Sequence, residues 1–221
     1  MNILIFGATG MVGQGVLREC LSASDVEHVE TIGRAATGLK HSKLREITHS
    51  NLLNCSSIET DLQNFDACFF CLGISSAGMT EAEYSHLTYD ITLAAAQVLV
   101  RLNPNMIFTY VSGAGTDSSE KGRTMWARVK GKTENALLRL PFKAVYLFRP
   151  GIIQPLNGAR SKTASYRWFY FVAKPFFPIL RAIMPKAILT TESMGQAMLN
   201  AARTGAPKNV LEVADIIALS K

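Results

Sequence analysis

The chain has 221 residues, of which 48% are hydrophobic and 18% charged, so it is long enough to bury the core of one ordinary globular domain. Its net charge of +6 is uneven: residues 1–120 carry 6 basic and 13 acidic side chains, whereas residues 121–221 carry 17 and 4. The N-terminal segment reaches a glycine after a few apolar residues and has no basic stretch, so we expect no signal peptide and a cytoplasmic protein.

Short apolar runs alternate with segments of helical periodicity along most of the chain. The patterns predict strands at 2–6, 28–33, 44–53, 66–73, 105–112, 142–148 and 209–213, and helices at 11–21, 57–62, 80–102, 126–140 and 191–203. Strands that alternate with helices of this length form a parallel sheet covered on both faces. We therefore predict an α/β fold with a doubly wound parallel sheet, in a single domain over 1–221.

The longest predicted helix, over 80–102, is expected to bury one continuous face. Thr80 is a suitable N-cap for it. Apolar or aromatic residues that share that face are Tyr84, Leu87, Ile91, Ala95, Val98 and Leu102.

The alternation stops after Pro150, and residues 152–188 have no regular pattern. They include the aromatic tract 166–186, in which basic residues and prolines interrupt the apolar run, so it is not a membrane span. Two functional readings stay open: a small lid region over a substrate pocket, or a patch that contacts a membrane surface or a protein. The excess of basic residues in the second half of the chain indicates either a solvent-exposed basic face or a surface that binds an anionic ligand or an anionic surface.

The four cysteines do not indicate a metal site. Cys68 and Cys71 have the C-x-x-C spacing, but they fall within an expected buried strand, where residues three apart point to opposite faces. We expect buried structural thiols and no bound metal. Nor does any recognised nucleic-acid-binding module accompany the basic charge.

The segment GATGMVG is a G-x-x-G-x-x-G loop between the first strand and the first helix. Gly7 permits a tight turn, Gly10 lets the backbone approach a pyrophosphate, and Gly13 lets the helix pack closely on the sheet. The N–H groups at the start of that helix would face the phosphates. The pattern in this context predicts a dinucleotide site; without a ligand, the same glycines would form only a tight turn.

Arg34 follows the second strand, where an acidic residue would bind a ribose 2′-hydroxyl group and a basic one a 2′-phosphate. No acidic residue follows closely. We therefore expect Arg34, helped by Lys40, to favour NADPH over NADH.

With GATGMVG, Arg34, VSGAGTDSS, VKGKTE and FRPGII in order, the chain resembles the short-chain dehydrogenase/reductase superfamily. The resemblance covers residues 1 to about 155 and is nearest to the atypical, Tat-interacting-protein-like NAD(P)-binding proteins, so it implies a Rossmann-like fold. It further implies pyrophosphate contacts from Gly7, Thr9, Gly10, Met11, Val12 and Gly13. Leu52 would lie beside adenine, Leu72 and Gly73 along a ribose, and Pro150 and Gly151 near the nicotinamide. Asn51 departs from the aspartate usual in the family.

The same resemblance places a substrate-orienting serine at Ser112 and a tyrosine–lysine pair at positions 126 and 130. Here position 126 is Trp, while Lys130 is kept and would bind the nicotinamide ribose. An indole N–H donates a hydrogen bond but cannot act as an acid near neutral pH. Tyr84, Tyr89 and Tyr110 are candidate substitutes for the missing acid, although each is also an ordinary core residue.

Two functions therefore stay open. One is an NADP-dependent oxidoreductase with an altered acid that acts on a small carbonyl or related substrate. The other is a non-catalytic dinucleotide sensor that engages a partner.

Overall fold

The computed structural model of the chain describes residues 1–159 and 188–221. Its main element is a seven-stranded sheet in the order β3-β2-β1-β4-β5-β6-β9, in which all neighbouring strands are parallel. The strands are β1 (Asn2–Phe6), β2 (His28–Gly33), β3 (Leu44–Thr48), β4 (Ala67–Phe70), β5 (Ile107–Val111), β6 (Ala144–Phe148) and β9 (Val210–Leu211). The predicted doubly wound parallel sheet is confirmed.

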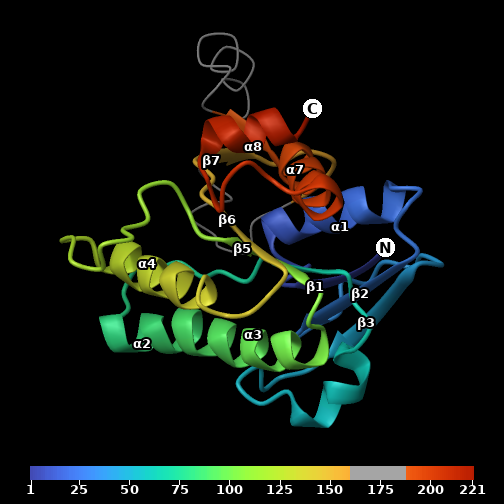
Figure 1. Cartoon of the computed structure of the whole chain (residues 1–221), viewed down its shortest axis with the longest axis horizontal. Helices are drawn as coiled ribbons and strands as arrows, with labels where there is room; N and C mark the ends of the chain where they lie inside the picture. The colour runs from blue at the N-terminus through green and yellow to red at the C-terminus, as the bar shows by residue number, and fades with distance from the viewer. Residues whose placement is uncertain (160–187) are drawn as a thin grey trace.

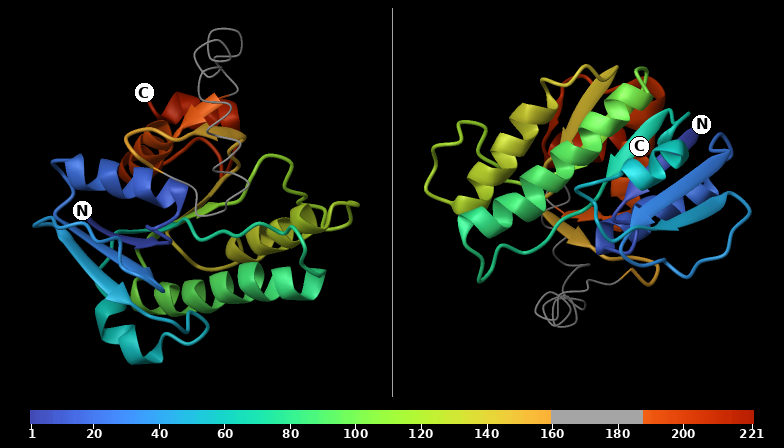
Figure 2. Two further views of the ribbon diagram at one scale, coloured as in Figure 1. Left: turned by 180° about the vertical axis from the view of Figure 1, so that it is seen from behind. Right: turned by 90° about the horizontal axis from the view of Figure 1, so that it is seen from below.

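Helices cover both faces of this sheet (Figure 1). One face carries α1 (Met11–Ser22), α7 (Thr191–Thr204) and α8 (Val213–Leu219). The other carries η1 (Ser56–Leu62), α2 (Glu81–Ser85), η2 (His86–Asp90), α3 (Ile91–Leu102) and α4 (Met125–Leu137). Figure 2 shows that α3 and α4 lie side by side on their face.

The two layers of the core follow from the alternation of side chains along β1. Ile3 and Ile5 pack with α1 and α7, whereas Leu4 and Phe6 pack with α3 and α4, and all four are fully buried. A strand buried on both faces explains why its sequence is continuously apolar rather than alternating.

The predicted helix over 80–102 is interrupted. It begins with a capping box between Thr80 and Glu83, as its sequence suggests, but residues 86–90 form a wider π-turn. That turn shifts the buried face, so that Leu87 is 41% exposed and Thr88 is buried instead. The expectation that Leu87 belongs to the buried face is therefore wrong.

The end of the chain also differs from its pattern. The strand predicted over 209–213 ends at Leu211, and the helix α8 follows, which the sequence pattern did not indicate. Glu212 is the N-cap of α8 and forms a capping box with Asp215, whose carboxylate accepts the Glu212 N–H at 2.8 Å. The capping interaction ends the strand early.

A second, two-stranded sheet joins the described ends of the irregular region. In it, β7 (Ile152–Gln154) pairs in parallel with β8 (Ile188–Thr190). Most of the expected lid over 152–188, and the whole aromatic tract 166–186, lie outside the described residues, so the single domain with a lid stays a prediction. In the described part of the chain, no helix is long and apolar enough to cross a membrane.

Cys68 and Cys71 lie on opposite faces of the sheet, as their spacing predicts. Cys68 belongs to the core layer beneath α3, and Cys71 packs against the layer beneath α1. Burial raises the pKa of the Cys71 thiol to about 12. All four cysteines are free thiols, and among the described residues no group of three His, Cys, Asp or Glu side chains could hold a metal ion.

Candidate functional site

The candidate site lies at the carboxyl edge of the sheet, where the strand order reverses. From β1 the chain continues outward to β2 and β3, then returns to place β4 on the other side of β1. In open parallel sheets, ligands bind outside the carboxyl ends of the strands at such a reversal. The predicted residues after β1, β4, β5 and β6 all lie at this edge, because the strands are parallel.

The glycine turn is packed too tightly for side chains at two of its positions. Gly7 has a φ of +81°, and a Cβ there would lie 2.8 Å from the Leu72 nitrogen. A Cβ on Gly13 would lie 2.2 Å from the Gly7 carbonyl oxygen. Gly7 and Gly13 are therefore required for the turn and for the close approach of α1, as the sequence predicts.

Gly10 has a different place in the turn. Its φ is −78°, and a Cβ there would lie 3.3 Å from the Gly7 oxygen, which is tight but not prohibitive. It is the N-cap of α1, makes no side-chain cap, and no acidic residue stands in the first turn, which contains Met11, Val12 and Gly13. The N–H groups of a first helical turn have no partners inside the helix, so this terminus is suited to an anion.

Contacts between backbones bring the other predicted cofactor residues together. The Cys71 N–H donates to the Phe6 oxygen at 2.9 Å, which places Leu72 and Gly73 directly beside the glycine turn. Similarly, the Ala114 N–H donates to the Pro150 oxygen at 2.8 Å, so Pro150 and Gly151 adjoin the loop after β5.

The end of β2 lies at the same edge. Arg34 is exposed, and no described residue pairs with its guanidinium group. Leu52 is buried, and Asn51 beside it is exposed. Glu46 on β3, which no sequence motif marks, also lies here, and its carboxylate accepts the Thr37 N–H at 2.6 Å in the loop after β2.

Helix α4 places Trp126, Lys130 and Glu134 at intervals of four residues, so they share one face. Lys130 is only 9% exposed, and its Nζ donates to the carbonyl oxygens of Ser112 at 2.6 Å and of Val111 at 3.4 Å. Burial lowers the pKa of Lys130 to about 8, against the opposing effect of the Glu134 charge. Lys130 is thus a buried amine at the edge of the sheet.

The Trp126 indole lies against the loop after β5. A Cβ on Gly113 or on Gly115 would come 3.8 Å from the six-membered ring of Trp126, which is ordinary contact distance. The larger side chain at the position of the usual tyrosine is therefore accommodated by a loop of small residues.

None of the three candidate tyrosines stands free at the edge of the site. Tyr84 and Tyr110 are 2% and 1% exposed, and burial raises the pKa of Tyr110 far above its ordinary range. The Tyr89 ring lies under the Lys132 ammonium group, 4.4 Å from it. Burial leaves Tyr84 and Tyr110 as core residues.

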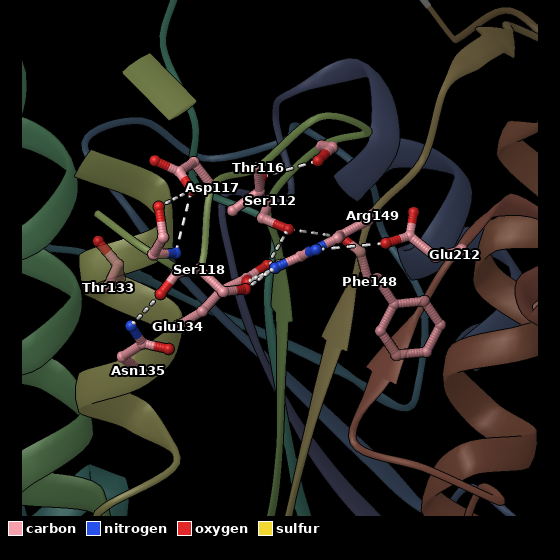
Figure 3. A network of polar contacts seen from close by, with 12 residues as sticks. Ser112, Thr116, Asp117, Ser118, Thr133, Glu134, Asn135, Phe148, Arg149 and Glu212 are labelled. Carbon is pink, nitrogen blue, oxygen red and sulfur yellow. Dashed lines mark hydrogen bonds and ion pairs between the residues drawn. The ribbon is translucent and has the colours of Figure 1, made fainter. Parts of the chain in front are cut away.

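A buried polar network anchors Ser112 (Figure 3). The Ser112 hydroxyl is 2.6 Å from Glu134 Oε1 and 3.1 Å from the Phe148 oxygen. Glu134 forms a two-bond ion pair with Arg149, and Arg149 also donates to Ser118 Oγ at 2.6 Å and to Glu212 Oε1 at 3.3 Å. Glu134 lies in the VKGKTE segment and Arg149 in FRPGII, but no pattern in the sequence indicates that the two side chains pair.

A cavity of about 700 Å³ adjoins the glycine turn at Ala8 and Thr9. It extends along α1, where Gln14 and Arg18 line it, and is closed by the loops 36–41 and 156–159 and the start of α7. Its lining residues do not include any of α4 or of the loop after β5, so the cavity lies apart from Lys130 and Ser112.

The chain is similar to a set of curated fungal proteins. It is 28% identical over 214 residues to the mitochondrial protein FMP52-2 of Scheffersomyces stipitis, which covers 94% of this chain and 90% of that protein. It is 29% identical over 166 residues to the mitochondrial protein FMP52 of Saccharomyces cerevisiae, and this match covers 74% of this chain and 69% of that protein. No protein-family model matches the chain. The expectation of a cytoplasmic protein is wrong by this comparison, because these relatives are named mitochondrial.

Solved structures share the fold at low sequence identity. The Bordetella bronchiseptica enzyme WbmF in complex with NAD⁺ has a TM-score of 0.70 and 15% identity, covering 98% of this chain and 76% of its own. A short-chain dehydrogenase/reductase from Burkholderia thailandensis has a TM-score of 0.67 and 16% identity, covering 98% and 92%. The UDP-glucuronic acid 4-epimerase of Bacillus cereus in complex with NAD has a TM-score of 0.66 and 14% identity, and the match covers 96% of this chain and 76% of the epimerase chain. The chain thus has the Rossmann-like fold of NAD-binding short-chain dehydrogenases and reductases.

Proposed function

We propose that this chain binds NADP(H) at the GATGMVG turn and acts as an atypical, Tat-interacting-protein-like oxidoreductase on a small carbonyl compound or the related alcohol. The observation that carries the proposal is the start of α1. Gly7 and Gly13 hold an uncapped helix terminus without acidic residues at the reversal point of the sheet. Such a terminus stabilises phosphate groups through its free N–H groups and its dipole.

The preference for NADPH rests on Arg34. Its exposed guanidinium group follows β2, where a 2′-phosphate would lie, and the nearby Glu46 carboxylate is engaged by the Thr37 N–H. A guanidinium group can bind a phosphate with two parallel hydrogen bonds. NAD is the less favoured cofactor on this reading.

Lys130 and Ser112 are the residues that we assign to the reacting end of the site. A bound nicotinamide dinucleotide would donate a hydride to the substrate or accept one from it. Lys130 would orient the nicotinamide ribose, and Ser112 the substrate, while Trp126 replaces the usual acid. General acid catalysis typically contributes about 10²- to 10⁴-fold, so turnover would be slow without it.

A second candidate is a dinucleotide sensor that does not turn over. It is favoured by Trp126, which is not an acid, and by the buried network that already engages the Ser112 hydroxyl. Under this reading, dinucleotide occupancy would alter a surface that a partner recognises.

The dinucleotide site can be tested by adding one negative charge at the start of α1, which should stabilise the fold but weaken dinucleotide binding. Met11→Glu adds an acidic residue to the first turn of α1, which should stabilise the free protein by about 0.3–1 kcal/mol through the helix dipole. The same charge should weaken NADPH binding, followed by fluorescence, roughly tenfold by repelling the phosphates. Met11→Gln is the uncharged control. Equal NADPH affinity in the two variants would contradict a phosphate site at this terminus.

A further inference from the structure

The hydroxyl group of Ser112 has no hydrogen left for a ligand. Its two partners are Glu134 Oε1 at 2.6 Å and the Phe148 carbonyl oxygen at 3.1 Å, and both are acceptors. A serine hydroxyl has a single hydrogen to donate and two lone pairs that can accept. Whichever partner receives the hydrogen, the Ser112 oxygen can act toward a ligand only as an acceptor.

The Glu134 carboxylate beside this hydroxyl group is held in place. Glu134 Oε1 also accepts from Arg149 Nε at 3.1 Å, and Oε2 accepts from the other arm of the guanidinium group. Arg149 is fixed in turn by Ser118 on the loop before α4 and by Glu212 at the start of α8 (Figure 3). Glu134 is 1% exposed, so it has no alternative contact with water.

The rest of Ser112 is fixed as well. Its backbone N–H donates to the Phe148 oxygen at 2.8 Å, and its carbonyl oxygen accepts from Lys130 Nζ at 2.6 Å. Glu134 lies one helical turn beyond Lys130 on the same face of α4, and its charge favours the ammonium form of that lysine. One carboxylate therefore acts on both residues assigned to the reacting end of the site.

We propose that Glu134 is a positioning residue that fixes Ser112 as a hydrogen-bond acceptor, so that the group bound beside Ser112 is a donor. The ligand class that fits is an alcohol, whose hydroxyl can donate to Ser112; the oxygen of a ketone or aldehyde cannot. This inference rests on the proposed function for placing a ligand at the carboxyl edge of β5. It narrows that function to a hydroxyl-bearing substrate.

The first test measures Lys130 and needs no ligand. The reactivity of Lys130 toward an acylating reagent, followed by mass spectrometry across pH, gives its pKa in the free protein. Glu134→Gln should lower that pKa, and Glu134→Asp should restore part of the difference. Glu212→Gln is the matched control, because Glu212 pairs with the same Arg149 but is 49% exposed and does not contact Ser112. An unchanged Lys130 pKa in Glu134→Gln would overturn the role of Glu134.

The second test compares two probes on the NADP⁺-loaded protein by saturation-transfer NMR. A tertiary methylcyclohexanol cannot be oxidised and cyclohexanone cannot react with NADP⁺, so both complexes are static. The wild-type protein and Glu212→Gln should favour the alcohol roughly tenfold, the scale of one hydrogen bond to a mismatched group. In Glu134→Gln the Phe148 oxygen still accepts the Ser112 hydrogen, while the new amide can donate to the Ser112 oxygen and compete with the alcohol for its lone pairs. This variant should therefore lose much of the preference for the alcohol.

The outcomes separate the two proposals. A wild-type preference for the ketone, an unchanged preference in Glu134→Gln, or binding of neither probe would overturn the acceptor assignment. A protein that does not bind NADP⁺ but shows the Lys130 shift would contradict the proposed function and support the role of Glu134. Circular dichroism of each variant, with Glu134→Asp as the smaller change, separates these effects from loss of the fold.

Discussion

Gly15 of α1 faces Thr191 of α7 so closely that a Cβ on Gly15 would lie 2.4 Å from the Thr191 carbonyl oxygen. The contact joins the helix after the glycine turn to the helix near the end of the chain. These two helices pack directly against each other on their face of the sheet.

Gly15→Ala should therefore destabilise the protein, although alanine is the better helix former by about 0.5–1 kcal/mol. The steric overlap involves a backbone oxygen, which cannot rotate away, and overpacking of this kind costs about 1–3 kcal/mol. Urea unfolding would measure the difference. Gly73→Ala is the control, since a Cβ on Gly73 meets nothing within 4 Å. Equal stabilities of the two variants would contradict the close packing of α1 on α7.

Arg34→Ala should weaken NADPH binding at least tenfold and leave NADH binding nearly unchanged, because only NADPH carries the 2′-phosphate. Competition titrations with both dinucleotides would measure the two affinities. Lys40→Ala, an exposed cation in the same loop, tests whether general positive charge is sufficient. A loss that is equal for NADPH and NADH would refute the assignment of Arg34.

Trp126→Tyr should raise NADP⁺-dependent oxidation of a panel of alcohols, and the reverse reduction of the corresponding aldehydes and ketones by NADPH, if the site is arranged for hydride transfer. The phenol would restore general acid catalysis, worth about 10²- to 10⁴-fold. Trp126→Phe removes the indole without supplying an acid and is the control. If neither the wild-type protein nor the tyrosine variant is active although both bind NADPH tightly, the result would favour the non-catalytic dinucleotide sensor.

Lys130→Met should change how stability depends on pH. The pKa of Lys130 falls from 10.5 to about 8 on folding, so between these values the unfolded chain binds more protons than the folded protein. The contribution of Lys130 to stability therefore rises across that window, by at most about 1.4 kcal/mol per pH unit. Below pH 8 the full cost of burying the charge is present.

Urea unfolding from pH 7 to 10 would test this dependence. The free energy of unfolding of the wild type, relative to Lys130→Met, should increase from pH 8 upward. Lys132→Met, two residues away and exposed, should show no such increase. A difference between wild type and Lys130→Met that stays constant with pH would mean that Lys130 keeps an ordinary pKa.

The sheet was predictable because its central strands are continuously apolar and its helices have clear periodicity. The π-turn at 86–90 was not, since periodicity assumes a constant number of residues in each turn. Thr92 Oγ1 donates to the Thr88 oxygen at 2.5 Å, one of the contacts that accompany the wider turn. Thr88 and Thr92 are both buried there, whereas Leu87 is exposed.

The site was partly predictable for a related reason. The glycine turn, Ser112 and Lys130 carry local motifs that can be recognised from spacing alone. Glu134 and Arg149 were missed because their importance comes from contact with each other and with Glu212, 63 residues after Arg149. Only the folded sheet brings these charges together.

The strand β9 also has a consequence for synthesis of the chain. The N–H groups of Leu147 and Arg149 on the β6 side are paired only when the carbonyl oxygens of Asn209 and Leu211 arrive, at 2.7 and 2.9 Å. A nascent chain in which β9 has not yet been made leaves β6 as an open edge, exposed to pairing with another chain. Completion of the sheet, and of the charge network behind Ser112, therefore waits for synthesis of the segment that contains β9 and Glu212.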